Sequence, residues 1–345
     1  MADIRRIVVA GTNWIGDAVM SVAGLRELRR LYPEAHLALL VRDWVADIYQ
    51  DQHLVDELIR IPPGLSLLQR ILWVTPRLRS FDLAVLFPNA FVNALQPMLA
   101  GVPRRVGYAA DGRGWLLTSR ARSRIKQLNR HQVYSYLDLL FQSELSPLDY
   151  LEDKTFVPRT ALCPRPQSIE RSRHLLEKKG GGQRPRVVLN PGAFFGAAKR
   201  WYPDRYAAVA DRLMLEQAAE IVLIGSSGER NLAEHIQTLM KRPPIILTGE
   251  TNLQDLMGLF SECDLLITND SGPMHLAAAL DTPQIALFGS TDEVATGPLS
   301  KQAHIIHKHV ACSPCLLREC PIDLRCFDGI EIDEVLGKAL TLLAC

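Results

Sequence analysis

Short apolar runs alternate with helix-like segments along almost the whole of this 345-residue chain. In the first half, apolar runs at 7–10, 36–41 and 83–87 are separated by helix-like stretches such as the amphipathic segment 18–31. Consecutive strands can run parallel in one sheet only if a crossover, usually a helix, returns the chain between them. The alternation therefore predicts an α/β fold built on parallel sheets.

The same rhythm returns in the second half, after a change of composition. Prolines, a charged helix-like stretch, three consecutive glycines and a further proline lie between 162 and 186, which is typical of a boundary between folding units. The chain is also too long for one ordinary core. We predict an N-terminal domain at 1–165, a linker at 166–185 and a C-terminal domain at 186–345. Both would be Rossmann-like and would face each other across a cleft at the carboxyl ends of their strands.

Composition and charge exclude several classes of protein. The chain has 39 basic and 38 acidic residues, so no global field draws it to nucleic acid or membrane. Its first residues lack the long apolar core of a signal peptide, and no segment offers the ~20 apolar residues that span a bilayer. Seven cysteines, an odd number, suit free thiols in a reducing compartment. The expected location is the cytoplasm.

The segment PGAFFGAAKRW, at 191–201, follows an apolar run and carries two glycines before Lys199 and Arg200. A glycine-containing loop after a strand, followed by paired cations, suits a diphosphate. Backbone N–H groups and positive side chains then converge on one anion. We predict that this loop holds a diphosphate.

A second loop, GTNWIGD at 11–17, joins the first predicted strand to the first predicted helix. It is not G-x-G-x-x-G, and the chain has no Walker A motif, which disfavours dehydrogenases and NTPases. Asp17 lies where the helix begins. It is either an acid that interacts with the helix dipole or a general base that takes a proton from a substrate hydroxyl.

Small and anion-friendly residues also follow other strands of the second half. Asp270, Ser271 and Gly272 open the predicted helix that carries His275, and they either cap this helix or bind a nucleotide diphosphate at its N-terminus. Ser226 and Glu229 follow another strand. Glu229 is either an exposed residue at a helix start or a ligand of ribose hydroxyls. Together these strand ends predict a bound nucleotide.

Four cysteines, Cys312, Cys315, Cys320 and Cys326, form C-x2-C-x4-C-x5-C. Four thiolates suit zinc, but the spacing is tighter than in the usual zinc ribbon, and structural or incidental thiols are the other interpretation. The chain has no Asp-x-Asp that could hold a nucleotide-bound cation. We assign no metal ligand.

Between residues 104 and 130 lie eight basic residues and one acidic residue, with Tyr108 and Trp115 among them. Such a run is often a solvated face. Phosphates or carboxylates of a glycolipid would also suit it, as would nucleic acid. We favour an anionic partner, bound with help from Arg77 and Arg79.

These motifs together resemble glycosyltransferase family 9, the lipopolysaccharide core heptosyltransferases. The similarity runs nearly end to end, and PGAFFGAAKRW favours the heptosyltransferase II group over heptosyltransferase I. It is carried by the segments GTNWIGDAVMS, FPNAFVNALQPMLAGVPRRVGY, NPGAFFGAAKRW, LTGET and TNDSGPMHLAAAL.

The resemblance implies a GT-B fold, with an acceptor-binding first domain and a second domain that binds ADP-heptose. It implies that Asp17 is the catalytic base, that Lys199 binds the donor phosphate, and that His275 matches the family histidine. The donor site is expected to comprise Lys199, Arg200, Ser226, Glu229, Asp270, Ser271, Gly272 and His275. The acceptor site is expected to comprise Asn13, Trp14, Asn89, Arg104, Arg105 and Arg120.

The implied reaction is an inverting transfer of heptose from ADP-L-glycero-β-D-manno-heptose to the inner core, heptosyl-Kdo-lipid A, of lipopolysaccharide. No cofactor is expected, and assistance by a divalent ion stays open. We expect a monomer that works at the cytoplasmic face of the inner membrane and has no nucleic-acid partner. The alternatives are heptosyltransferase I, another nucleotide-sugar transferase of the same family, or a non-catalytic nucleotide- or RNA-binding module.

Overall fold

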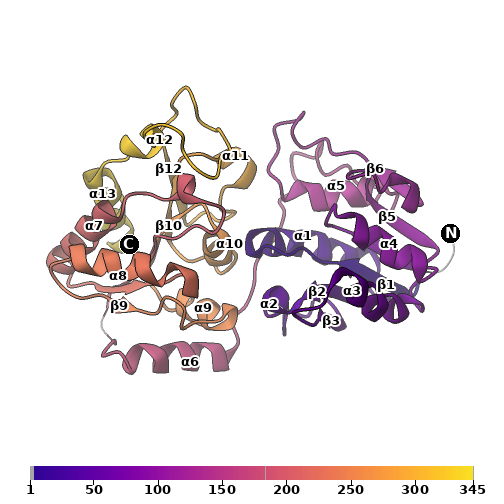
Figure 1. The fold of residues 1–345 in the computed structure, drawn as a ribbon, viewed down its shortest axis with the longest axis horizontal. Coiled ribbons are helices and arrows are strands. Elements are labelled where there is room, and N and C mark those ends of the chain that lie inside the picture. Colours follow the sequence, from indigo (N-terminus) through magenta and orange to yellow (C-terminus); the bar gives the residue numbers. More distant parts are fainter. Residues whose placement is uncertain (1–3, 183, 345) are drawn as a thin grey trace. The chain divides into compact units, whose positions relative to one another are not determined.

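A computed structural model describes residues 4–182 and 184–344 of the chain. The chain divides between Thr160 and Ala161 into two compact units, each of which is an α/β domain. Each domain contains one six-stranded sheet in which every pair of neighbouring strands is parallel (Figure 1). The predicted α/β class with two Rossmann-like sheets is therefore present.

The sheet of the first domain has the order β3-β2-β1-β4-β5-β6. Its strands are β1 (Arg6–Ala10), β2 (His36–Arg42), β3 (Glu57–Ile61), β4 (Leu83–Leu86), β5 (Arg104–Tyr108) and β6 (Ser119–Ala121). Its helices are α1 (Ile15–Leu31), α2 (Asp43–Ala46), α3 (Leu67–Val74), α4 (Phe91–Leu99) and α5 (Tyr134–Gln142).

Both faces of the first sheet are apolar. Val8 and Leu40 pack with Val74 of α3 and Ala94 of α4 in one buried cluster. Ile7, which alternates with Val8 along β1, is also fully buried. Because successive side chains of a strand point to opposite faces, the central strand is covered on both sides, as in a doubly wound fold.

The sheet of the second domain has the order β12-β11-β10-β7-β8-β9. Its strands are β7 (Arg186–Asn190), β8 (Glu220–Leu223), β9 (Ile245–Ile246), β10 (Leu265–Asn269), β11 (Gln284–Phe288) and β12 (Ala303–His307). Its helices are α6 (Pro166–Glu177), α7 (Pro203–Glu216), α8 (Arg230–Leu239), α9 (Leu253–Phe260), α10 (Gly272–Ala279), α11 (Glu293–Thr296), α12 (Arg325–Asp328) and α13 (Ile332–Leu343).

Numbered from its own first strand, each sheet has the order 3-2-1-4-5-6 of the doubly wound nucleotide-binding fold. In the second domain, Tyr206 of α7, Ala233 of α8 and Val335 of α13 share a buried cluster with the sheet. Met274 of α10 packs with Phe288 in a separate cluster. Helices from both halves of the domain therefore enclose the sheet.

The segment 166–185, predicted as a linker, carries a helix of the second domain. Figure 1 shows α6 beside α9. A Cβ atom on Gly258 of α9 would lie 2.2 Å from the carbonyl oxygen of Ser168, so the close approach requires a glycine there. The many charged residues of α6 favoured a solvated linker, whereas the face with Ser168, Ser172 and Leu176 is buried.

The sequence patterns located most of the remaining elements and missed some of the shorter ones. The predicted strands 7–10, 36–41 and 83–87 agree with β1, β2 and β4 to within one residue at each end. The strands β3, β5, β6 and β12 were not predicted: β3, β5 and β6 contain charged residues, and β12 has a histidine on either side of its two isoleucines. None of the helices in the described residues has the length and apolar character needed to cross a membrane.

Candidate active site

Several of the predicted site residues follow the first and fourth strands of each sheet, counted along the chain. Asp17 comes after β1 and Asn89 after β4, whereas Lys199 comes after β7 and Asp270 after β10. In each sheet these two strands are neighbours, and the strand order reverses between them. The carboxyl ends of parallel strands at such a reversal are the usual ligand sites of open α/β sheets. Each domain thus presents a candidate site of its own.

Asp17 lies in the first turn of α1, which begins three residues before the predicted start. Its Oδ1 accepts hydrogen bonds from Gln132 Nε2 at 2.9 Å and from the Tyr136 hydroxyl at 3.5 Å. Burial, with the charge of Asp17 as a further cause, raises the pKa of Tyr136 well above its usual value. Tyr136 therefore stays protonated and donates to the carboxylate. The interaction of Asp17 with the helix dipole is also favourable, but it is not the whole role of the residue.

Close packing of α1 against α5 places these donors beside Asp17. A Cβ on Gly24 of α1 would lie 2.9 Å from Phe87 Cζ and 2.9 Å from Tyr136 Cβ. Tyr136 also packs edge-on against Phe87, with ring centroids 5.0 Å apart. Gln132 and Tyr136 are more than 110 residues from Asp17 in the chain, so spacing along the sequence gave no signal of their role.

Three of the predicted acceptor residues lie at the carboxyl edge of the first sheet. Asn13 and Trp14 are exposed in the loop after β1, and the backbone oxygen of Asn13 accepts a hydrogen bond from Trp44 Nε1 at 3.0 Å. Asn89 Oδ1 accepts one from Arg113 Nη2 at 3.2 Å. Arg113 is fully buried and also bonds the backbone oxygen of Tyr108, so it ties the loop after β4 to the loop after β5.

Two other predicted acceptor residues, Arg104 and Arg105, begin β5 and so lie at the opposite edge of the sheet. Arg104 Nη2 donates to the backbone oxygen of Ser143 at 2.6 Å, and Arg105 Nε donates to that of Leu116 at 2.8 Å. The structure therefore does not bring them to Asp17. The sequence pattern failed here because it did not reveal the strand that orients these arginines. Arg120, in β6, is exposed.

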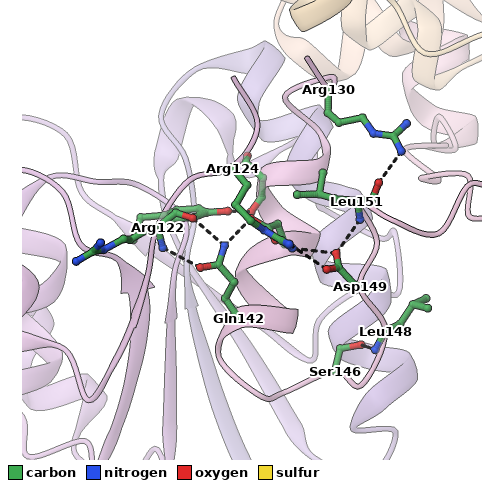
Figure 2. A network of polar contacts seen from close by, with 11 residues as sticks. Arg122, Arg124, Arg130, Gln142, Ser146, Leu148, Asp149 and Leu151 are labelled. Atoms are coloured by element: carbon green, nitrogen blue, oxygen red, sulfur yellow. Dashed lines mark hydrogen bonds and ion pairs between the residues drawn. The ribbon is translucent and has the colours of Figure 1, made fainter. Parts of the chain in front are cut away.

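Arg124, in the same basic segment, has a structural role (Figure 2). Its guanidinium binds Asp138, which is fully buried, and Asp149, with Nη2 2.9 Å from Asp149 Oδ1. Gln142 Nε2 donates to Asp138 Oδ2 at 2.7 Å and to the backbone oxygen of Arg122 at 2.8 Å. The hydrogen bond from Arg124 is the largest cause that lowers the pKa of Asp149. Part of the basic segment 104–130 therefore makes contacts within the domain, so the segment as a whole is neither a solvated face nor a ligand-binding surface.

Two further arginines, Arg77 and Arg42, lie at opposite edges of the first sheet. Arg77 stacks on the Trp73 ring at 3.7 Å in the turn that precedes β4, which is at the amino edge. Arg42, the last residue of β2, lies at the carboxyl edge over the Trp44 ring at 5.5 Å. Burial, followed by the charge of Arg42, lowers the pKa of Arg70.

Arg42 and Arg70 form a pair that the sequence analysis missed. The Nε atoms of both are buried, and they have no hydrogen-bond partner among the described residues. Two neighbouring guanidinium groups repel each other unless an anion lies between or beside them. The signal was available in part, because Arg42 closes a predicted strand.

In the second domain, Lys199 Nζ lies 2.7 Å from Asp270 Oδ2, and both side chains are largely buried. Asn269 holds the diphosphate loop to β10: its Nδ2 donates to the backbone oxygen of Pro191 at 2.8 Å, and its Oδ1 accepts from the Trp201 N–H at 3.1 Å. The loop that carries Lys199 is thus fixed against β10, the strand that ends just before Asp270.

Ser271 and Gly272 form the start of α10, which carries the buried His275. The Ser271 side chain makes no capping hydrogen bond with this helix. Its Oγ accepts instead from Asn190 Nδ2 at 2.8 Å. The capping interpretation therefore does not hold for Ser271, whose side chain leaves the first N–H groups of α10 without a bond to it.

The loop after β8 contributes Ser226 and Glu229. Glu229 Oε2 accepts from the Ser226 N–H and from the Ser226 hydroxyl, both at 2.8 Å, so the two residues form a capping box. Arg200 Nη2 lies 3.8 Å from Glu229 Oε1. A Cβ on Gly192 would lie 2.1 Å from Glu229 Oε1, so this glycine lets the two loops meet. All eight predicted donor residues are therefore at one edge of the second sheet.

Cys312, Cys315, Cys320 and Cys326 line one small cavity in the second domain. All four are free thiols. Within the described chain, no three of their sulfur atoms lie within 4.8 Å of one another. The sulfurs are therefore not gathered as in a four-thiolate zinc site.

Comparison with known proteins agrees with this geometry. The family model "Glycosyltransferase family 9 (heptosyltransferase)" matches residues 71–325. Lipopolysaccharide heptosyltransferase 2 of Salmonella typhimurium is 32% identical over 311 residues, which are 87% of each chain. Lipooligosaccharide heptosyltransferase 2 of Campylobacter jejuni serotype O:2 is 27% identical over 98% of each chain.

The solved structure of Escherichia coli ADP-heptose lipopolysaccharide heptosyltransferase II superposes with a TM-score of 0.80, at 27% identity and 98% coverage of each chain. This likeness confirms the predicted GT-B class, whereas the predicted cleft stays a prediction. The family model covers well over half of the sequence. The chain therefore belongs to glycosyltransferase family 9, the heptosyltransferases.

Proposed function

We propose that this enzyme transfers heptose from ADP-L-glycero-β-D-manno-heptose to the heptosyl-Kdo-lipid A inner core of lipopolysaccharide, with inversion at the anomeric carbon. The observation that carries the proposal is the division of groups between the two sheets. The first holds a hydrogen-bonded carboxylate, and the second holds the neighbouring cations Lys199 and Arg200, with Lys199 paired to Asp270 just before α10. The names of the relatives supply the sugar and the acceptor.

Asp17 would act as the general base. It removes the proton from an acceptor hydroxyl while that oxygen forms a bond to the anomeric carbon and the bond to the diphosphate breaks. Gln132 and Tyr136 donate to Asp17 Oδ1, and hydrogen bonds of this kind orient a carboxylate. The base is thus positioned before the acceptor arrives.

Lys199 and Arg200 would stabilise the departing ADP, together with the N-terminus of α10. In the structure the charge of Lys199 is balanced by Asp270, and its ammonium lies 5.1 Å from the Phe195 ring centroid. An ammonium has three donors, so Lys199 can keep Asp270 and also contact a phosphate oxygen. Preorganised cations of this kind lower the barrier because they need no rearrangement as charge develops. No further cofactor is required in this proposal.

The acceptor would be recognised by Asn13, Trp14 and Asn89, with Arg120 nearby on the edge strand. The pair Arg42 and Arg70 supports an acidic acceptor, because the two guanidinium groups lie close to each other at the carboxyl edge. A carboxylate or phosphate of the inner core would relieve the repulsion between the two guanidinium groups.

We test the activity by incubating the protein with ADP-heptose and heptosyl-Kdo-lipid A, then measuring the acceptor mass and the release of ADP. The expected result is a mass increase of one heptose with one ADP per transfer. A gain only on Kdo-lipid A, which lacks the first heptose, would indicate heptosyltransferase I instead. A gain only with another nucleotide sugar would indicate a different transferase of the family.

Failure to form any product with these donors would contradict the enzymatic proposal. Binding of RNA with a steep dependence on salt would then support the non-catalytic module.

We also propose that the protein acts as a monomer at the cytoplasmic face of the inner membrane, because its acceptor carries lipid chains. Sedimentation with vesicles of anionic and of zwitterionic lipid tests the membrane part. Binding to the anionic vesicles is expected to weaken as salt rises. Analytical ultracentrifugation tests the monomer, and a dimer mass would contradict it.

A further inference from the structure

Two histidines and a glutamate meet in the second domain, outside the proposed donor site. Glu293 begins α11, His307 ends β12, and His309 follows two residues later. Their ligand atoms all lie within 4.8 Å of one another. Glu293 Oε2 lies 2.7 Å from His307 Nδ1, and Glu293 Oε1 lies 3.5 Å from His309 Nε2. One carboxylate therefore faces two imidazoles.

The hydrogen bonds on the far side of His307 assign its proton. Ser313 Oγ lies 2.5 Å from the backbone oxygen of Gly289, which can only accept, so the hydroxyl donates there. Ser313 Oγ must then accept from His307 Nε2, 3.0 Å away. A neutral His307 carries its proton on Nε2, and the lone pair on Nδ1 faces the lone pairs of Glu293.

Two acceptors at 2.7 Å need a cation between them, which is a proton or a metal ion. The ring of His309 lies beside that of His307, with centroids 4.4 Å apart, so one ion could contact a nitrogen of each ring. A metal ion would use both neutral imidazoles and the carboxylate at once.

We propose that Glu293, His307 and His309 form a site for a divalent transition metal of the zinc type, with water as a further ligand. Ligand atoms around tetrahedral zinc lie about 3.3 Å apart at ordinary Zn–N and Zn–O distances. The chosen atoms of the three residues lie within 4.8 Å of one another, so modest side-chain rotations bring one oxygen of Glu293 and the two ring nitrogens to that spacing. Ser313 accepts the N–H of the other ring nitrogen of His307, and a contact of this kind usually orients a ligating histidine.

The site differs in exposure between its members. His307 is 3% exposed and Glu293 21%, whereas His309 is 73% exposed. The ion can therefore enter from solvent beside His309. Bound there, it would join α11, the end of β12 and, through Ser313, the Gly289 end of β11. We infer a structural clip on the loops of this sheet edge.

Binding of Zn²⁺ to the chelator-treated, repurified full-length protein tests the proposal. One high-affinity ion per chain is expected by calorimetry and elemental analysis, with a rise in Tm of about 5–10 °C at a hundredfold excess over Kd. Glu293→Gln and His309→Ala should each weaken binding at least tenfold. His304→Gln, which changes another histidine of β12, is the matched control and should bind as the wild type does.

Co²⁺ as a probe separates this site from the neighbouring cysteines. Nitrogen and oxygen ligands give weak visible bands, whereas thiolates add intense charge-transfer absorption. The proposal expects the weak bands alone, unchanged in Cys312→Ser and lost in His309→Ala. Thiolate bands that vanish in Cys312→Ser, the absence of stoichiometric binding, or full affinity in both Glu293→Gln and His309→Ala would each overturn it. Since His309 is exposed, His309→Ala is expected to fold normally, which keeps the test decisive.

Discussion

The two domains share one strand order and differ in the chemistry that follows the central strands. After β1 comes a carboxylate held by two neutral donors, Gln132 and Tyr136. After β7 comes a lysine held by the carboxylate of Asp270. The first arrangement joins a carboxylate to an amide and a hydroxyl, whereas the second joins a lysine to a carboxylate in an ion pair.

This difference shows that the sheet supplies only the position of a site. Function depends on the loops and on the helices that pack behind them. In the first domain, α5 reaches Asp17 because Gly24 lets the helices approach. In the second, Asn269 fixes the loop to its neighbouring strand. A substitution at one of these sites should therefore change the role of its own domain and leave that of the other domain unaltered.

The largest effect is expected from Asp17→Asn. Removal of the base should lower kcat by about 100- to 10,000-fold, while the Kd for ADP-heptose stays unchanged because the donor residues lie in the other domain. Transfer assays and calorimetry measure the two quantities. Glu34→Gln, an exposed acid of the same domain, is the control and should keep wild-type kcat. A wild-type kcat for Asp17→Asn would remove Asp17 from the role of base.

The next effect concerns stability of the first domain. Arg124→Met leaves Asp138 buried without its cation and should lower the free energy of unfolding by about 2–3 kcal/mol. Arg122→Met is the matched control (Figure 2). The contacts of Arg122 in this network run through its backbone, so the loss should stay within about 0.5 kcal/mol. Urea unfolding measures both variants, and equal losses would contradict the structural role of Arg124.

A smaller effect is expected from Lys199→Met on the donor side. Loss of a charged hydrogen bond should raise the Kd for ADP by about 10- to 100-fold. The variant also leaves the buried carboxylate of Asp270 without its cation, so a loss of stability contributes to the rise in Kd. The double variant Lys199→Met with Asp270→Asn removes that buried charge. It should regain stability without regaining affinity, and a full recovery of ADP binding would show that Lys199 does not contact the phosphate.

The smallest effect is a pH dependence of the first domain. Arg124 holds the pKa of Asp149 below its usual value in the folded state. The stabilisation is therefore present above the ordinary aspartate pKa of about 4 and is lost as the pH falls toward the folded value. Thermal unfolding of the wild type should lose Tm more steeply below this pH than Arg124→Met does. Parallel curves would contradict the coupling.

The sequence predicted the second domain better than the first. Apolar runs there mark β10 and β11 plainly. The loops that follow the strands are rich in small residues, and they indicated Lys199, Asp270 and Ser271 as site candidates. In the first domain, β5 begins with two arginines, so it read as part of a charged run. Its orientation, which turns Arg104 and Arg105 away from Asp17, depends on pairing with β4 and has no local signature.

By itself, the sequence determined the parallel α/β class, the two domains and the strand-end motifs, because hydrophobic period and glycine-containing loops are local properties of the chain. Only the tertiary structure decided which charges meet. Gln132 beside Asp17, Arg124 between Asp138 and Asp149, and Glu293 between two histidines are contacts between distant segments. Such contacts form when helices and strands pack, and the energy of a charge depends on the partners and burial that packing provides.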